Sequence, residues 1–133
     1  MQTQKIQLVN NLTFNKSSAK HINIVRVLFH KEFTKIDFSY NSNKILYIKG
    51  TQILINPEIY IETKFATYDL LSADIFKKAF FKTDKDIKYF SLLFETIDED
   101  LDCFDIVDPY LNKELFKFNF TDICIPTKNL VSQ

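Results

Sequence analysis

The chain has 133 residues, a length that suits one domain, and 46% of them are hydrophobic, which is ordinary for a globular fold. Its 17 basic residues balance 17 acidic ones, so the chain lacks the positive excess that binding to nucleic acid or to an anionic membrane requires. The single Gly excludes the Gly-rich loops that bind phosphates and dinucleotides. Composition therefore predicts one domain over residues 1–133 with no cofactor.

In the N-terminal third of the chain, apolar and polar residues alternate with a period of two, and this pattern predicts β-strands. The first two strands span residues 4–14 and 21–30. The second is apolar on both faces, which indicates a central strand or one that the N-terminal segment covers. The third strand, 33–41, has an apolar face and a polar face. Its apolar face carries Ile36, Phe38 and Tyr40.

Turn residues separate the strands that follow. Asn41-Ser42-Asn43 predicts a hairpin turn, since Asn tolerates a positive φ. Gly50 predicts a tight turn between strands over 44–49 and 52–56, because Gly adopts a positive φ without steric cost.

Two tyrosines are expected on outward faces of strands. Asn56-Pro57 marks the entrance of strand 58–66, on which Tyr60 lies opposite an apolar face that carries Ile59 and Ile61. Tyr89 has the same outward position on strand 88–96. Exposed tyrosines are enriched at protein interfaces, so both are candidates for contact with a partner. The alternative is that they fill the strand surface through cross-strand pairing.

The second half of the chain predicts three strands, 88–96, 103–108 and 115–125, with two short helical turns over 72–80 and 109–116. The inward residues of these strands are Phe90, Leu92, Phe94, Phe104, Ile106, Phe116, Phe118 and Phe120. About eight or nine short strands and at most one or two helical turns predict an all-β fold. We expect a two-sheet antiparallel β-sandwich, in which phenylalanines interdigitate, ahead of a barrel.

The N-terminus lacks the basic segment, apolar stretch and cleavage site of a signal peptide. No apolar run approaches the roughly 18 residues that a membrane helix needs. These features predict a cytoplasmic protein.

The cysteines and histidines give no catalytic or metal-binding pattern. Cys103 and Cys124 lack a CxxC spacing and are expected to be reduced thiols packed as small hydrophobes. A disulfide between them would require both secretion and adjacent strands. His21 and His30 lie nine residues apart, so on a regular strand they point to opposite faces, and a locally hydrogen-bonded or exposed His is expected.

An acidic stretch lies between two of the predicted strands. Asp98, Asp100 and Asp102 match the first three ligand positions of a calcium loop. The rest of that pattern fails, because Cys103 stands where Gly is required and Pro109 stands where Glu is required. We therefore expect a solvated loop, with a weak divalent-cation site as the alternative.

Three motifs, FSLLFE (90–95), FDIVDP (104–109) and FNFTDI (118–123), resemble a poorly characterised bacterial immunoglobulin-like β-sandwich accessory domain. The resemblance implies a sandwich that occurs alone or beside catalytic domains, with no catalytic residues to transfer. In such relatives the loop that corresponds to 97–102 is less acidic and a Gly occurs near the third motif. This sequence lacks that Gly.

The sequence thus predicts a non-enzymatic protein-binding or accessory module of a bacterial cytoplasmic system, without catalytic, metal or cofactor residues. Its partner would be another protein or a second copy, not nucleic acid or a membrane. The alternatives are an inhibitor or immunity protein that neutralises a toxin or defence enzyme, with the acidic stretch as an anionic mimic, and the weak cation-binding domain. The candidate contact residues are Tyr60, Tyr89, Phe80, Phe81, Asp98, Asp100 and Asp102.

Overall fold

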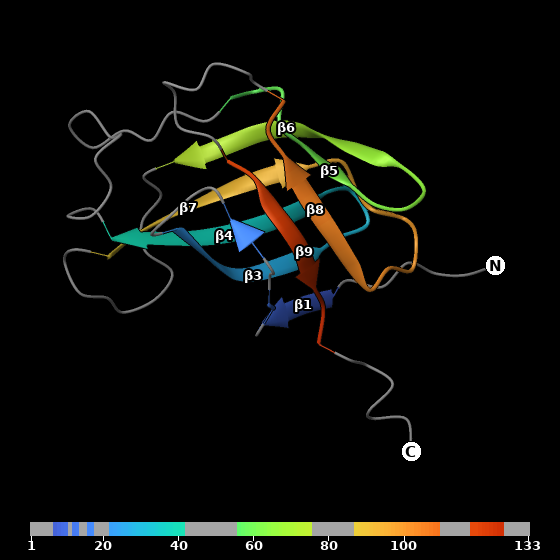
Figure 1. Ribbon diagram of the computed structural model, residues 1–133, viewed down its shortest axis with the longest axis horizontal. Coiled ribbons are helices and arrows are strands. Elements are labelled where there is room, and N and C mark those ends of the chain that lie inside the picture. The colour runs from blue at the N-terminus through green and yellow to red at the C-terminus, as the bar shows by residue number, and fades with distance from the viewer. Residues whose placement is uncertain are drawn as a thin grey trace.

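The computed structural model describes a chain whose strands form one antiparallel sheet, curled into half of a barrel (Figure 1). The described residues are 7–10, 12–13, 16–17, 22–41, 56–75, 87–109 and 118–126. Their strands are β1 (Gln7–Asn10), β2 (Lys16–Ser17), β3 (Ile22–Phe29), β4 (Thr34–Asn41), β5 (Tyr60–Glu62), β6 (Thr67–Ile75), β7 (Ile87–Phe94), β8 (Cys103–Val107) and β9 (Phe120–Cys124). The prediction of an all-β antiparallel fold is confirmed. Within these ranges no helix has the length and apolarity to cross a membrane.

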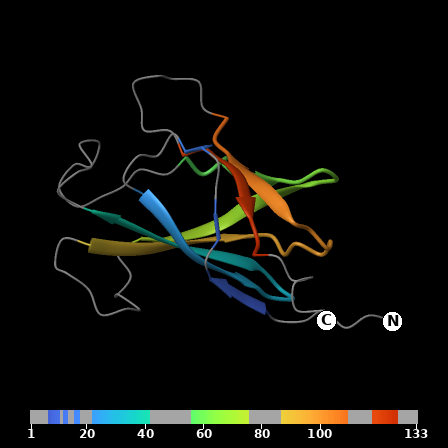
Figure 2. The same ribbon diagram turned by 60° about the horizontal axis from the view of Figure 1, so that its bottom comes forward.

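The sheet is continuous, in the order β1-β3-β4-β7-β6-β5-β8-β9-β2, without the break that separates the two sheets of a sandwich. Strand β6 belongs to both halves, because residues 67–69 pair with β5 whereas residues 70–75 pair with β7. The register shifts between Leu70 and Ser72, and such a β-bulge bends a strand. One bent strand therefore turns the corner, and the sheet folds over on itself (Figure 2).

Strand β3 is central, as its two apolar faces predict. It lies between β4 and β1, and β1 belongs to the N-terminal segment. Its neighbour β4 pairs with β7 without a register shift, from Thr34 opposite Phe94 to Asn41 opposite Ile87. Strands of this length with clean alternation form the regular half of the sheet.

The concave face of the curled sheet holds the hydrophobic core. The ring centroid of Phe38 on β4 lies 5.0 Å from that of Phe90 on β7 and 5.0 Å from that of Phe118, which precedes β9. Phe38 therefore connects the two halves of the sheet. The predicted inward orientation is confirmed by burial at Ile36, Phe38, Tyr40, Ile59, Ile61, Phe90, Leu92, Phe94, Phe104, Ile106, Phe118 and Phe120.

Two predictions of local structure are wrong. The helical turn predicted over 72–80 is replaced by strand at residues 72–75, which pair with β7. Hydrogen bonds to an existing strand override a weak local preference for helix. The strand predicted over 58–66 ends at Glu62, where the chain turns back. Other predictions lie outside the described residues: the turn at Gly50 and the strands beside it, the helical turn beyond Pro109, His21, Phe80, Phe81 and Phe116.

The convex face carries a buried carboxylate, although alternation places it on the polar side of β4. A register shift between Ile24 and Arg26 brings Arg26 opposite Asp37. The Arg26 Nε donates to Asp37 Oδ2 at 2.6 Å, and the Ser91 hydroxyl donates to Asp37 Oδ1 at 2.6 Å. Asp37 is only 2% exposed, so this face is held by a charged pair as well as by backbone hydrogen bonds.

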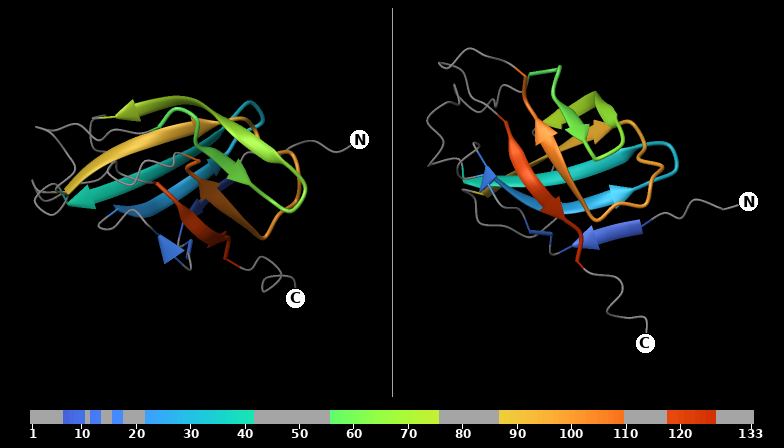
Figure 3. Two further views of the ribbon diagram at one scale, coloured as in Figure 1. Left: turned by 45° about the horizontal axis from the view of Figure 1, so that its top comes forward. Right: turned by 45° about the vertical axis from the view of Figure 1, so that its right-hand side comes forward.

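The N-terminal segment pairs with both edges of the half-barrel (Figure 3). Strand β1 lies against β3 at one edge, and β2 lies against β9 at the other. Between them, Thr13 bridges to β9: its N–H donates to the Cys124 carbonyl at 3.3 Å, and the Cys124 N–H donates to the Thr13 carbonyl at 2.8 Å. Described residues that are close together in the sequence therefore pair with both edges of the half-barrel.

Candidate functional site

Three connections between strands lie side by side at one end of the half-barrel, on the right of Figure 1. We call this the loop end; it consists of residues 30–33 (β3–β4), 63–66 (β5–β6) and 95–102 (β7–β8). The third connection is fastened to the first, because the Thr96 hydroxyl donates to the His30 carbonyl at 2.6 Å and the Ile97 N–H donates to the Thr34 hydroxyl at 3.2 Å.

Glu99 fastens the third connection to the second. Its Oε2 accepts hydrogen bonds from the hydroxyls of Thr63 and Tyr68, both at 2.6 Å. Burial of the ring, followed by the hydrogen bond to Glu99, raises the pKa of Tyr68 above its ordinary value. Tyr68 therefore keeps its proton and donates to Glu99 throughout the neutral pH range. The carboxylate holds two neighbouring parts of the β5–β6 hairpin.

The β5–β6 hairpin turns on Lys64 and Phe65. The Thr63 N–H donates to the Ala66 carbonyl at 2.9 Å, and the Thr63 hydroxyl accepts from the N–H groups of Phe65 and Ala66 at 3.2 and 3.1 Å. Among the described non-Gly residues only Asp122 has a positive φ, so this turn is not of the primed types that favour Asn-Gly. A Thr side chain orders the turn instead, and it leaves the Phe65 side chain 81% exposed.

The acidic stretch lies at the loop end as an exposed connection. Asp98, Asp100 and Asp102 are exposed, whereas Ile97 and Leu101 are buried in the core. Because the apolar residues turn inward, the carboxylates lie on the outer side of the loop. In the part of the chain that the structure describes, no group of three His, Cys, Asp or Glu residues is placed to hold a metal ion.

The predicted tyrosines are not brought together with the acidic stretch. Tyr60 and Tyr89 are half-buried near the starts of β5 and β7, whereas the loop end follows the ends of these strands. Tyr89 lies opposite Ser39, and Tyr60 lies opposite Asp69 and Val107. Both fit the cross-strand pairing that the sequence left open as the alternative. Phe80 and Phe81 lie outside the described residues.

His30 is locally hydrogen-bonded, as predicted. Its backbone N–H donates to the Phe33 carbonyl at 2.9 Å, and its ring Nδ1 accepts from the Glu32 backbone N–H at 3.1 Å. The imidazole stacks on the ring of Phe33 with centroids 4.4 Å apart. These contacts give His30 a structural role in the β3–β4 turn.

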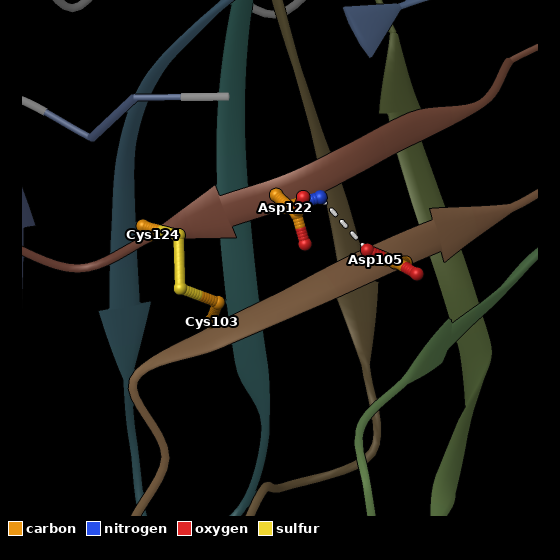
Figure 4. Close-up of a disulfide and its surroundings, with 4 residues drawn as sticks. All are labelled: Cys103, Asp105, Asp122 and Cys124. Carbon is orange, nitrogen blue, oxygen red and sulfur yellow. Dashed lines mark hydrogen bonds between the residues drawn. A yellow bond between two sulfur atoms is a disulfide. The ribbon is translucent and has the colours of Figure 1, made fainter. Parts of the chain in front are cut away.

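Cys103 and Cys124 form a disulfide, so the prediction of two reduced thiols is wrong (Figure 4). They lie directly opposite each other on β8 and β9, with Cα atoms 4.1 Å apart. Cys spacing alone does not reveal a strand pairing, which explains the error. The adjacent strands that a disulfide requires are present.

A β-bulge lies beside the disulfide. The register between β8 and β9 shifts between Phe104 and Ile106, and Asp122 adopts a φ of 55°. Its N–H donates to Asp105 Oδ1 at 2.8 Å (Figure 4). The left-handed region favours Gly, and Asp is among the few other residues that enter it. Asp122 therefore occupies a left-handed position at this bulge without being Gly.

Asp108 fastens the far end of the β8–β9 pair, a role the sequence did not indicate. Its Oδ1 accepts from the Asn56 amide at 3.0 Å and its Oδ2 accepts from the Phe118 N–H at 3.0 Å. The Asp108 N–H donates to Asn119 Oδ1 at 2.6 Å. Asn56 also orders its own turn by accepting from the Glu58 N–H at 3.0 Å. Buried carboxylates require such partners, which a sequence does not display.

The cysteines are joined, Ser91 donates to Asp37, and His30 serves its own turn, so none of these is set up as a nucleophile with a base. The loop end combines an exposed ring, exposed carboxylates and rigid support.

Comparison with protein-family models, with curated proteins and with solved structures finds no match. The resemblance to an immunoglobulin-like accessory domain therefore stays a prediction.

Proposed function

We propose that the chain is a non-enzymatic binding module that contacts a protein partner through the loop end. The observation that carries this proposal is the fastening of three connections to one another, through Thr96 and Glu99, around a hairpin that leaves Phe65 81% exposed. Loops on a rigid scaffold are common binding surfaces, because their conformation needs little further ordering when a partner binds.

The charge of the loop end supports a protein partner. Five exposed acidic residues lie there, Glu32, Glu95, Asp98, Asp100 and Asp102, against two exposed basic residues, Lys31 and Lys64. Such a surface repels nucleic acid. It attracts a basic protein surface and speeds the encounter with it.

A second candidate is the inhibitor or immunity protein, and the exposure of Asp98, Asp100 and Asp102 is what favours it. In that case the carboxylates would occupy the site of an anionic substrate on a toxin or defence enzyme. Removing their charge would abolish inhibition of that enzyme. If binding to the partner is unchanged after charge reversal at all three positions, this candidate is rejected.

The test of the first proposal is capture with the full chain in its native host, followed by affinity measurement with the purified partner. We expect Asp98→Lys with Asp100→Lys to weaken binding at least tenfold. Glu58→Lys is the control, since Glu58 is exposed but precedes β5, away from the loop end. This substitution should change the affinity less than twofold. Failure to capture any protein, or equal affinities for both variants, contradicts the proposal.

The cytoplasmic location predicted from the N-terminus stays a prediction, and the Cys103–Cys124 disulfide favours an oxidising compartment instead, because thiols are kept reduced in the cytosol. Alkylation of thiols in intact cells, followed by mass measurement of the chain, distinguishes the two. A cytoplasmic chain gains two alkyl groups, and a chain in an oxidising compartment gains none until it is reduced. The sandwich interpretation is supported only in that Phe38 and Phe118 place the two halves of the sheet face to face.

A further inference from the structure

We infer that Phe65 is the anchor of the loop end, and that it inserts into an apolar pocket with a basic rim on a partner protein. The inference rests on the proposed function and adds to it the contact residue and the chemistry of the partner. Three observations carry it: the exposure of the ring, the rigidity of the turn that holds it, and the charge around it.

The first observation is exposure at a protruding position. Phe65 is 81% exposed at the tip of a hairpin, whereas the other exposed large apolar residues in the described ranges, Leu8 and Leu71, are 50% and 55% exposed on strands. A single exposed Leu on a strand is ordinary surface. An aromatic ring at a tip is different, because it can be buried completely by a concave partner, and aromatic residues dominate the energetics of interfaces.

The second observation is that the backbone carrying the ring is held in place before binding. The Thr63 hydroxyl accepts hydrogen bonds from the N–H groups of Phe65 and Ala66. The Glu99 carboxylate accepts hydrogen bonds from the hydroxyls of Thr63 and Tyr68. The turn is thus tied to the β7–β8 connection as well as to its own strands. An anchor with a fixed backbone loses little conformational freedom on binding, so most of the free energy of burying the ring contributes to affinity.

The third observation selects the partner. Exposed carboxylates at Glu95, Asp98 and Asp100 lie on the connection to which the hairpin is tied, and Lys64 is the exposed cation of the turn. A pocket that accepts Phe65 would meet these carboxylates at its rim. Basic residues there would complement them, whereas an anionic bilayer would repel them. The observations therefore favour a protein pocket over insertion into a membrane.

The test places a photo-crosslinking residue, p-benzoyl-phenylalanine, at position 65 of the full chain in the native host. The control carries it at position 71, where Leu71 is also an exposed apolar residue. We expect crosslinks from position 65 to a single protein, at peptides that contain apolar residues next to Lys or Arg, and few crosslinks from position 71. Equal yields from the two positions, crosslinks to lipid, or crosslinks to a second copy of the chain would overturn the inference.

Affinity for the purified crosslinked partner gives an independent measure. Phe65→Ala should weaken binding at least tenfold and Phe65→Tyr less than threefold, while Leu71→Ala should change it less than twofold. An unchanged melting temperature of Phe65→Ala would show that the loss concerns the interface. Vesicles of phosphatidylcholine with phosphatidylglycerol should not bind the wild-type chain, and binding that depends on Phe65 would contradict the inference.

The two proposals fail in different ways. If the wild-type chain captures no protein, the proposed function fails, and this inference fails with it. If a partner is captured through the loop end but Phe65→Ala binds it as tightly as the wild type, only the role of Phe65 fails.

Discussion

The two halves of the curled sheet are held together by different means. In one half, β4 pairs with β7 along eight consecutive residues without a register shift, and β3 extends the ladder. In the other half, β8 and β9 pair at three positions with a shift between them. The long ladder is stabilised by regular backbone pairing over apolar residues. The short one is too brief and irregular to be stabilised in the same way.

In the longer half, the contacts of Asp37 with Arg26 and Ser91 add to a complete ladder. In the shorter half, side chains hold the strands where the ladder is missing. The disulfide joins the start of β8 to the end of β9, and Asp108 holds the opposite end of the pair. Thr13 adds a backbone bridge to Cys124 from the N-terminal segment. Covalent and charged contacts between side chains can therefore hold two strands together where their backbone pairing is short. Four predictions test this difference, in decreasing order of the expected destabilisation.

The contact that joins the halves should be the most sensitive. Phe38→Ala removes a ring that is fully buried and packs against Phe90 of one half and Phe118 of the other. The lost burial and the remaining cavity should lower the free energy of unfolding by about 3–5 kcal/mol, measured by urea denaturation. Phe65→Ala is the control and should change it by less than about 0.5 kcal/mol, because that ring is exposed. A loss below about 1 kcal/mol for Phe38→Ala would contradict the role assigned to this ring.

Removal of the disulfide should destabilise the short half. The bond joins residues that are 21 apart in the sequence, and opening a loop of that length should lower the free energy of unfolding by about 3 kcal/mol. The measurement compares the oxidised chain with the reduced chain and with Cys103→Ser, Cys124→Ser. Hydrogen exchange should accelerate in β8 and β9 before it does in β4 and β7. Reductant should leave the double variant unchanged, and uniform acceleration across the sheet would argue against two distinct halves.

Asp108→Ala should have a smaller effect on the same half. The substitution removes the carboxylate that accepts hydrogen bonds from the Asn56 amide and the Phe118 N–H. The free energy of unfolding should fall by about 1.5–3 kcal/mol, as for hydrogen bonds to a charged group. Asp98→Ala is the matched control, because that carboxylate is exposed, and it should lie within about 0.5 kcal/mol of the wild type. Equal losses for both variants would show that Asp108 does not fasten the strands.

Alkaline pH should weaken the attachment of the loop end to β6, the strand that both halves share. Burial and the hydrogen bond to Glu99 raise the pKa of Tyr68, so the folded chain keeps this proton at pH values where the unfolded chain loses it. The stabilising contribution is therefore complete below about pH 10, the ordinary pKa of Tyr, and falls as pH rises further. Urea denaturation from about pH 9 to about pH 11 should show a shallower decline for Tyr68→Phe than for the wild type. Tyr40, whose pKa is also raised by burial, is present in both chains, so its titration affects both. If the free energy of unfolding falls equally with pH in the two chains, Tyr68 makes no contribution.

Local alternation predicted the core because burial on a strand repeats every second residue. Phe38, Phe90 and Phe118 were identified in this way, and all three are fully buried. If the period of two were continued from Ile59 and Ile61 through Thr63, Phe65 would also face inward. The hairpin turn interrupts the period there, and Phe65 becomes the most exposed large apolar side chain among the described residues.

The site depends on contacts between segments far apart in the sequence, and these are not encoded in local patterns. Glu99 meets Tyr68 across 31 positions, and Asp108 meets Asn56 across 52. The disulfide could be predicted only from the pairing of β8 with β9, and the spacing of the two cysteines does not reveal that pairing. Alternation places Asp37 on the polar face of its strand, but its burial arises from contacts with Arg26 and Ser91 on two other strands.

The N-terminal segment lies along both edges of the sheet, with β1 beside β3 and β2 beside β9. An unpaired edge strand is a template for another chain, and here one short stretch protects two such templates. Its detachment would expose both at the same moment. Each exposed edge could then accept the same segment of a neighbouring molecule, so the chain contains the elements of a reciprocal strand exchange between two copies.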